Sequence, residues 1–284
     1  MWESNAKDIC PLRSLVVESA TFAYVSTELQ ALAEAKNYYR WVIRQFAPFI
    51  GKRVIEVGAG IGTFAGSLLN HVAVSELVLV EPSANLLPLL QRRFAKDPRV
   101  KIVPGYFQPI AIPPGIDSIV LVNVLEHIAE DQAFLEDARA ALIPGGTLLL
   151  LVPALPWLFG SLDQAFGHYR RYTKTALANK LHVVGFDIIH LAYVNLLGIA
   201  GWFLTGKVFG RTTLKSGYVR WYDRWVIPWL SRLEGRWEPP CGQSLIVIAR
   251  KCDPAEDTSF QDRRGPHAGE QTHTGPRRRL GWSC

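Results

Sequence analysis

Short, nearly continuous apolar runs alternate with amphipathic segments over residues 53–154. The apolar runs predict strands at residues 53–60, 75–83, 99–105, 117–128 and 144–154. Helical spacing predicts helices at residues 61–72, 84–97 and 130–142 and a longer one at 27–50, with Pro88 expected to strain its own helix. Alternation of this kind indicates an α/β fold, with a mostly parallel, doubly wound sheet covered on both faces.

The pattern changes after Pro153. Residues 155–172 read as a long polar and aromatic loop, a kind of segment that compact domains keep mainly for function. A helix with a Thr173 cap and a Gly185 stop follows, then a strand at 186–195 and a last strand at 243–250. We expect an N-terminal extension at 1–26, one domain at 27–252 with a helical, aromatic insertion at 196–240, and a disordered tail at 253–284.

The stretch "VIEVGAGIGTF" places Glu56 at the end of the first strand and three glycines, Gly58, Gly60 and Gly62, in the turn that follows. Ligands of doubly wound sheets bind beyond the carboxyl ends of the strands, where glycines allow a close approach. The dinucleotide pattern would need a glycine where Thr63 stands. Because a carboxylate repels a pyrophosphate, Glu56 favours a phosphate-free ligand with a cationic end, such as S-adenosylmethionine.

A second acid, Glu81, ends the second strand about 20 residues after the glycines, where a carboxylate can accept both ribose hydroxyls. NAD sites share that feature. An NAD-dependent oxidoreductase therefore stays an alternative function, as does a protein that binds S-adenosylmethionine without catalysis.

The motifs "VIEVGAGIGTF", "LVEPS", "NVLEHI" and "IPGGTLLLLVP" occur in the order and spacing of class I S-adenosylmethionine-dependent methyltransferases. The chain resembles in particular the type-11/type-12 group, which includes ubiquinone-pathway enzymes. The resemblance implies a Rossmann-like, seven-stranded sheet with the last strand antiparallel. It also implies cofactor contacts from Tyr39, Glu56, Gly58, Ala59, Gly60, Gly62, Glu81, Pro82, Asn123, Val124 and Leu125.

The expected adenine site departs from that family pattern. Many relatives carry an acid after the third strand, whereas this chain has Tyr106 and Phe107 there. We expect adenine to be held by stacking on these rings and by backbone groups, or by Gln108.

Two histidines follow strands at the expected active edge and are candidate bases for a hydroxyl acceptor. His127 follows the fourth strand, and His168 lies in the loop 155–172. Helix capping or a backbone hydrogen bond is the alternative role for His127, and exposure in the loop is the alternative for His168. No His, Cys or Asp group has metal-ligand spacing, so no metal is expected.

The sequence "HYRRY" places Tyr169, Arg170, Arg171 and Tyr172 in the loop expected over the acceptor. Adjacent guanidiniums suit a carboxylate or phosphate on a substrate. A salt bridge from the arginines to Asp163 is the alternative.

The insertion at 196–240 is rich in tryptophan and arginine. Trp221, Trp225 and Trp229 recur every four residues, so they share one helical face, and Pro228 is expected to kink that helix. Tryptophan beside arginine suits a membrane interface, a lid over a large apolar acceptor, or a homodimer face.

Composition narrows the function classes. A net charge of +6 is too small for a dedicated nucleic-acid binder. Four scattered cysteines without a CxxC motif indicate free thiols. We therefore expect a cytoplasmic enzyme, in peripheral contact with a membrane if the insertion binds lipid, that acts on a small-molecule or lipid-linked acceptor.

Overall fold

The architecture of the computed structural model is a seven-stranded mixed sheet in the order β3-β2-β1-β4-β5-β7-β6. The structure describes residues 23–24, 28–109 and 114–252. The strands are β1 (Arg53–Val57), β2 (Glu76–Glu81), β3 (Val100–Pro104), β4 (Ile116–Val122), β5 (Leu142–Pro153), β6 (Phe186–Val194) and β7 (Ser244–Lys251). Strand β7 is antiparallel to both β5 and β6, whereas β1 to β5 pair in parallel. The predicted doubly wound sheet with an antiparallel last strand is confirmed.

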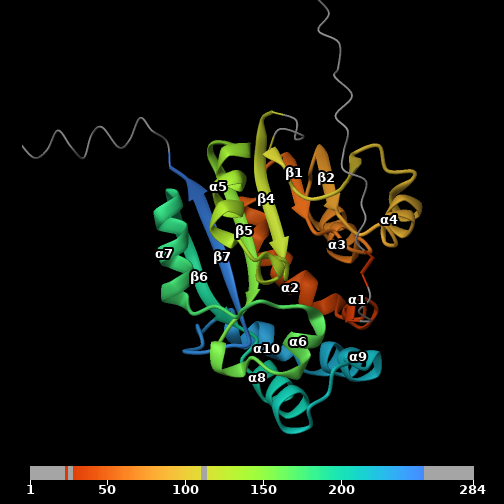
Figure 1. Cartoon of the computed structure of the whole chain (residues 1–284), viewed down its shortest axis with the longest axis vertical. Coiled ribbons are helices and arrows are strands. Elements are labelled where there is room, and N and C mark those ends of the chain that lie inside the picture. The colour runs from red at the N-terminus through yellow and green to blue at the C-terminus, as the bar shows by residue number, and fades with distance from the viewer. Residues whose placement is uncertain (1–22, 25–27, 110–113, 253–284) are drawn as a thin grey trace, which may run out of the picture. The chain divides into compact units, whose positions relative to one another are not determined.

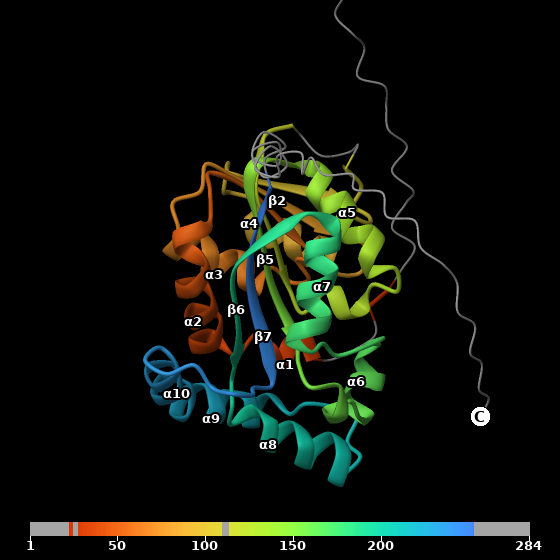
Figure 2. The ribbon, with the colours of Figure 1, turned by 90° about the vertical axis from the view of Figure 1, so that its left-hand side faces the viewer.

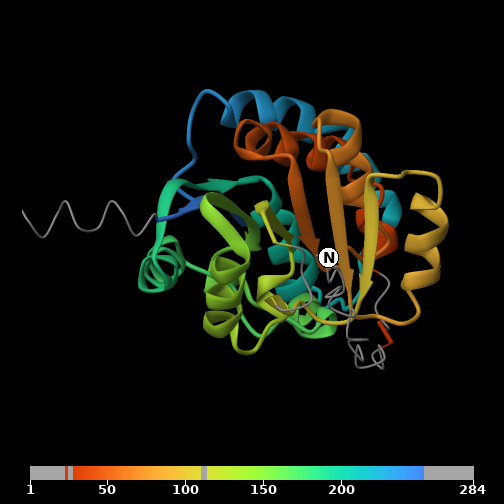
Figure 3. The same ribbon diagram turned by 90° about the horizontal axis from the view of Figure 1, so that it is seen from above.

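Helices cover both faces of this sheet (Figures 1 and 2). The α-helices that precede β6 along the chain are α1 (Glu28–Leu32), α2 (Lys36–Phe46), α3 (Thr63–His71), α4 (Leu87–Phe94), α5 (Asp131–Ala141), α6 (Ser161–Phe166) and α7 (Lys174–Val184). Seen from above, α2 and α3 lie on one side of the strands and α5 and α7 on the other (Figure 3). Each layer has its own apolar core, centred on Phe46 and Leu68 in one and on Leu135 and Leu181 in the other. Burial on both faces explains why the central strands read as unbroken apolar runs.

The insertion folds into α8 (Gly198–Trp202), a π-helical turn (Phe203–Val208), α9 (Ser216–Trp225) and α10 (Ile227–Glu234). Together with α6, these helices lie beyond the end of the sheet where β4 finishes (Figure 1). The predicted helical character of the insertion is confirmed. Because β1, β2 and β5 run parallel to β4, their carboxyl ends face the same region.

Buried polar contacts attach the insertion to the domain. The Asp223 carboxylate in α9 accepts the backbone N–H groups of Asn37 and Tyr38 at 2.9 and 2.8 Å. Those N–H groups belong to the first turn of α2, whose own N-cap residue, Ala35, has no side-chain acceptor. In α10, the Glu234 carboxylate accepts the N–H groups of Asn195 and Leu196 in the turn after β6.

Four sequence-based expectations need correction. The segment 155–172 is no long open loop, because it contains a single 3₁₀ turn and α6. Pro88 stands in the first turn of α4, where its missing N–H costs no hydrogen bond, so it starts the helix without straining it. The helix expected over 27–50 is divided between α1 and α2. Trp229 lies in α10 and not in α9, since the helix ends before Pro228.

Two boundaries stay untested. The tail at 253–284 and the extension at 1–26, apart from residues 23–24, lie outside the described residues. Among the residues that are described, no helix combines the length and apolarity required to cross a membrane. Cys241 and Cys252, the two cysteines in the described part, are free thiols.

Candidate active site

The glycine turn, residues 58–62, joins β1 to α3 in a conformation that side chains oppose. Gly58, Gly60 and Gly62 have φ angles of 68°, 57° and 74°, all in the left-handed region. A Cβ atom on Gly58 would lie 2.6 Å from the Val124 side chain, and one on Gly62 would lie 2.5 Å from Phe94. The turn therefore requires glycine for its conformation and for its close neighbours alike.

Glu56 is the penultimate residue of β1, two positions before the first glycine of the turn. Its side chain is 3% exposed, and Oε2 has no hydrogen-bond partner among the residues that the structure describes. Desolvation by burial raises the pKa of Glu56 to about 8, although a backbone hydrogen bond from Ala65 and the charge of Arg93 act in the opposite direction. A buried carboxylate oxygen without a donor is unstable alone, and the ammonium of an amino-acid ligand would satisfy it.

Glu81 ends β2 and holds the glycine turn from the other side. Its Oε2 accepts the Gly60 N–H at 2.6 Å, and its Oε1 accepts the Ser83 N–H at 2.9 Å. Carboxylate oxygens have spare lone pairs, so these bonds leave capacity for ribose hydroxyls. The carboxylate thereby fixes the turn through Gly60.

Some of the remaining predicted cofactor residues lie beside the glycine turn, and the others are buried or half-buried. Asn123, Val124 and Leu125 follow β4 beside the turn, and Asn123 has a φ of 53°, a strained value of the kind that clusters at functional sites. Tyr39 is buried and packs edge-on against Phe64, so its ring is part of the core. Ala59 is buried as well and Pro82 is half-buried.

The expected adenine corner is open to solvent. Tyr106 is 69% exposed, whereas the Phe107 ring packs 5.3 Å from that of Phe134. Gln108 is exposed too. Phe107 is thus fixed against α5, and Tyr106 is free to stack.

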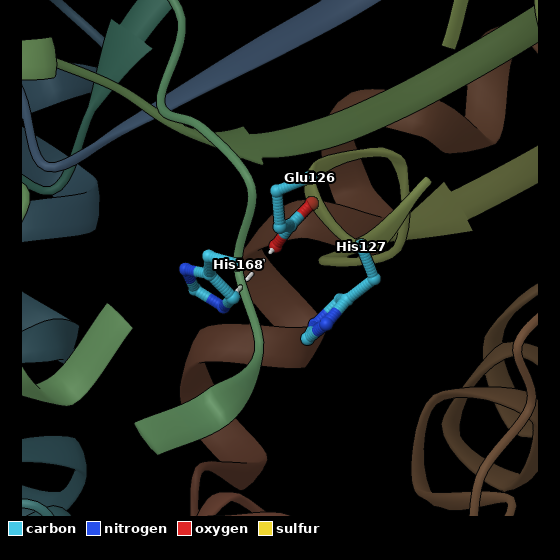
Figure 4. Close-up of side chains that lie close together, drawn as sticks. All are labelled: Glu126, His127 and His168. Atoms are coloured by element: carbon cyan, nitrogen blue, oxygen red, sulfur yellow. Dashed lines mark ion pairs between the residues drawn. The ribbon is translucent and has the colours of Figure 1, made fainter. Parts of the chain in front are cut away.

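Both candidate bases meet at one place, together with an acid. Glu126, His127 and His168 offer ligand or proton-accepting atoms that all lie within 4.8 Å of one another; we call these three residues the Glu–His–His cluster. Figure 4 shows the Glu126 carboxylate pointing toward the His168 ring, with His127 on the neighbouring side. The two histidine rings meet edge to face, with centroids 4.7 Å apart. Residues 41 positions apart in sequence therefore form one site.

Burial perturbs two members of the cluster. Glu126 is 0% exposed, and desolvation raises its pKa to about 8. Burial also lowers the pKa of His127 to about 4; the neighbouring His168 adds to this shift, and a backbone hydrogen bond with Gly167 opposes it. His127 is therefore a neutral ring at physiological pH.

Asp163 in α6 organises the cluster from behind. Its carboxylate, 0% exposed, accepts hydrogen bonds from His168 Nδ1 at 2.9 Å, Arg171 Nε at 2.7 Å and Trp202 Nε1 at 3.1 Å. Although burial acts to raise it, the pKa of Asp163 is lowered, because these donors and the Arg171 charge outweigh the desolvation. With Nδ1 engaged, His168 presents Nε2 toward Glu126, 4.0 Å from Oε1.

The four predicted substrate residues lie differently from what we expected. Arg171 is buried against Asp163 and under the Trp202 ring, so the salt bridge stands in place of a substrate contact. Tyr172 is also buried, and its hydroxyl donates to Asp131 at 2.9 Å. Arg170 pairs with Asp131 at 2.9 Å, and Tyr169 is 62% exposed. Of the four, Tyr169 is the side chain most open to a substrate.

Sequence reasoning missed two acids, Glu28 and Glu126, and named Asp163 only as a possible salt-bridge partner of the arginines. Glu28 precedes Leu29, which contacts the position above Gly60; its Oε2 has no partner within the described ranges, and burial raises its pKa to about 7. Glu126 adjoins His127 in a motif already recognised, so adjacency could have revealed it. The salt bridge between Asp163 and Arg171 is the alternative that the sequence left open, whereas the contact of Asp163 with Trp202 joins distant segments and gives no local signal.

A family model described as "Methyltransferase domain" matches residues 29–191. A demethylmenaquinone methyltransferase of Clavibacter sepedonicus is 27% identical over 143 residues, covering 48% of this chain and 56% of the relative. A mitochondrial ubiquinone biosynthesis O-methyltransferase of Schizosaccharomyces pombe is 25% identical over 113 residues, covering 38% and 40%. The chain thus spans about half the length of these curated relatives or less.

Among solved structures, the chain is similar to phosphoethanolamine N-methyltransferase 2 of Haemonchus contortus in complex with S-adenosyl-L-methionine. The TM-score is 0.50 at 20% identity, covering 76% of this chain and 53% of that one. At this identity the likeness concerns the fold. The family match rests on the sequence of residues 29–191, which holds the glycine turn and the Glu–His–His cluster.

Proposed function

The chain belongs to the class I S-adenosylmethionine-dependent methyltransferases, and we propose that it methylates a hydroxyl oxygen of a small-molecule or lipid-linked acceptor. The observation that carries this proposal is the Glu–His–His cluster. It begins two residues after Val124, the side chain that closes on Gly58, so the cofactor crevice and the cluster are neighbours. Proton-accepting groups beside a methyl donor suit an acceptor that must lose a proton.

The cofactor site fits S-adenosylmethionine through residues of this chain. Glu56 offers an unpartnered buried oxygen, as judged over the described residues, to the ammonium, and Glu81 offers lone pairs to the ribose. The positive φ angles of the three glycines set the backbone of the turn that lies between these two acids in sequence. Bound S-adenosylmethionine supplies the methyl carbon, whose bond to sulfur breaks, with its electron pair left on sulfur, as the acceptor oxygen bonds to carbon.

The chain's own task is to align the acceptor and remove its proton. Removal of a hydroxyl proton by a positioned side chain typically contributes about 10²–10⁴-fold. His168 is held by Asp163 with Nε2 directed at the cluster, so this ring is placed to receive the proton. Burial lowers the pKa of His127 to about 4, which makes that ring a weak proton acceptor. The name of the fission-yeast relative, an O-methyltransferase, supports oxygen as the methylated atom.

The test combines cofactor binding with turnover. We expect His168→Ala to bind S-adenosylhomocysteine within about 3-fold of the parent by calorimetry, and to lose about 10²-fold or more in methylation of phenolic acceptors. His182→Ala, at an exposed position of α7, is the matched control and should retain full activity. Equal turnover in His168→Ala and parent would refute the role of the cluster. Methylation of amines but not of hydroxyls would refute the oxygen acceptor.

We also propose that the insertion contacts an anionic lipid surface, which suits a lipid-linked acceptor. Trp221, Trp225 and Trp229 are 61%, 58% and 73% exposed. Arg224 lies 5.4 Å from the Trp225 ring and Arg232 lies 5.6 Å from that of Trp229. Exposed indole rings beside guanidinium groups are typical of a membrane interface. The opposite faces of α9 and α10 bury Asp223, Ile227 and Leu230 in the domain, so the rings are displayed by an anchored element.

Vesicle co-sedimentation tests this surface. The parent should bind vesicles containing phosphatidylserine more tightly than neutral vesicles, and the Trp225→Ser, Trp229→Ser double variant should lose most of that binding. Asp137→Ser, an exposed change in α5, serves as the control. Equal binding to both vesicle types, or none, would eliminate the lipid surface; a dimer that dissociates in the double variant would assign the rings to a homodimer face.

A further inference from the structure

The Glu–His–His cluster has the donor set of a metal centre. It combines one carboxylate and two imidazoles, drawn from the 3₁₀ turn after β4 (Leu125–His127) and from the segment after α6. Their ligand atoms lie within 4.8 Å of one another. Ligands about 2.0–2.2 Å from a shared ion must lie about 3–3.5 Å apart, so side-chain movements of about 1 Å would complete the site.

Glu126 supplies an independent reason to expect a cation. Its side chain is 0% exposed, and neither carboxylate oxygen has a hydrogen-bond partner within the described part of the chain. Figure 4 shows this carboxylate aimed into the cluster. Buried charges are normally paired or bound to metal, because an isolated one is very costly. Glu126 is thus a buried acid without a hydrogen-bond partner among the described residues, and a divalent cation would pair with its carboxylate.

The surrounding charges permit a cation. Arg171 faces Glu126, but its guanidinium is 2.7 Å from Asp163, which balances it. Burial raises the pKa of Glu126 to about 8, so with neutral imidazoles the Arg171 and Asp163 charges cancel and no net positive charge repels a cation, which would displace the Glu126 proton on binding. The second layer is of the kind that metal sites use: Asp163 binds Nδ1 of His168 and leaves Nε2 toward Glu126. His127 is likewise held by a backbone hydrogen bond with Gly167.

We propose that Glu126, His127 and His168 bind a borderline divalent cation of the Zn²⁺, Mn²⁺ or Fe²⁺ type. Imidazole donors disfavour Mg²⁺ and Ca²⁺, which select oxygen ligands. Three protein ligands leave positions open, as in catalytic sites. This proposal rests on the proposed methylation of a hydroxyl and deepens it by making the two histidines ligands instead of proton acceptors: an acceptor hydroxyl bound at an open position would be acidified by the cation and release its proton to water before the oxygen attacks the methyl carbon.

The experiment uses the full chain, stripped of metal by a chelator and then titrated with ZnCl₂ and with CoCl₂. Calorimetry should report one tight site. Co²⁺ should develop visible absorption bands of a protein-bound ion. Glu126→Gln, which keeps size and removes charge, should weaken cation binding at least about 10²-fold, and His168→Ala should do the same. His182→Ala should leave it unchanged, and circular dichroism should show all variants folded.

Two outcomes overturn the site: the parent binds neither cation, or Glu126→Gln and His168→Ala bind as tightly as the parent. Failure of the proposed function looks different. If cations bind through Glu126 but no hydroxyl acceptor is methylated, the cation site is supported and methylation of a hydroxyl oxygen is refuted. If the stripped protein binds no cation yet methylates a hydroxyl at full rate, the proposed function is supported and the cation site is refuted.

Discussion

The glycine turn and the Glu–His–His cluster are neighbours at one edge of the sheet, yet they are built in opposite ways. The turn is local: Glu56, the three glycines and Glu81 lie within 26 residues of sequence, and the Glu81 carboxylate holds the turn by accepting the Gly60 N–H. The cluster is assembled from the 3₁₀ turn after β4 and the segment after α6, and it depends on Asp163 of α6, which binds His168 and is contacted by Trp202 of the insertion. A site of the first kind can be recognised from sequence, whereas one of the second kind needs the fold.

This contrast predicts that a substitution can damage the cluster without loss of cofactor binding at the glycine turn, and the reverse. The largest effect should come from Asp163→Ala, which leaves the buried Arg171 guanidinium without its carboxylate. Breaking a buried ion pair on one side costs about 3–5 kcal/mol, so the free energy of unfolding in urea should drop by that amount. Asp137→Ala, at an exposed site, should cost almost nothing. If the Asp163→Ala protein stays folded, S-adenosylhomocysteine should still bind. A loss of binding equal to the loss of activity would contradict the claim that the glycine turn and the cluster are independent of each other.

The converse change is Gly58→Ala. The left-handed φ of 68° and a Cβ only 2.6 Å from Val124 should displace the turn. We expect S-adenosylhomocysteine affinity to fall about 30-fold, equivalent to about 2 kcal/mol. Zinc binding by the cluster should be retained. Calorimetry with both ligands on one preparation measures the two effects, and Gly217→Ala, at an open position of α9, is the control.

A pH titration sharpens the account of Glu56. Its pKa of about 8 lies above the ordinary value of 4.5, so the apoprotein is stabilised by the neutral acid below pH 4.5 and loses that contribution as pH rises through about 8. An ammonium ligand favours the carboxylate. Binding should therefore release a proton, and affinity for S-adenosylhomocysteine should rise by up to about 10-fold per pH unit until about pH 8.

Calorimetry in buffers of different ionisation enthalpy would detect that released proton. Glu56→Gln should bind more weakly at pH 8 and show no such release. An unchanged proton release in the glutamine variant would assign the titration to another group, and Glu28 would be the next candidate because its pKa is raised to about 7.

The smallest expected effect concerns the tie between the insertion and the domain. Asp223→Ala removes the carboxylate that accepts the first N–H groups of α2, and loss of a helix cap costs about 1 kcal/mol. Asp223→Asn should restore part of it. Urea unfolding measures the change. A loss of several kcal/mol would mean that the insertion is part of the core and does not behave as an attached unit.

Most of the fold could be predicted because it follows from local signals. Strand positions followed from apolar runs, and the Thr173 cap of α7 is confirmed, its side chain accepting the Ala176 N–H at 3.1 Å. The errors share a cause, because tertiary contacts and not local sequence determined where these helices begin and end. Short α6 has too few residues for a visible period, and α2 lacks a local cap because Asp223 supplies one from 186 residues away.

The candidate site was predictable in the same uneven way. Glu56 and Glu81 stand at strand ends, where position alone indicates a role. Arg171 was expected to face a substrate because pattern cannot distinguish a guanidinium that is buried and paired from one that is free. Glu126 was overlooked since an acid beside a histidine carries no signal until His168 is brought alongside.

The place of β7 between β5 and β6 has a consequence for synthesis on the ribosome. The twelve-residue β5 ends at Pro153, but its second neighbour begins only at Ser244. During translation, at about 5–20 residues per second, one edge of this apolar strand stays unpaired until roughly 90 further residues have been synthesised. An open strand edge invites pairing with other chains. The nascent protein therefore passes through an interval in which it is most exposed to aggregation, and that interval ends only when its last strand is released.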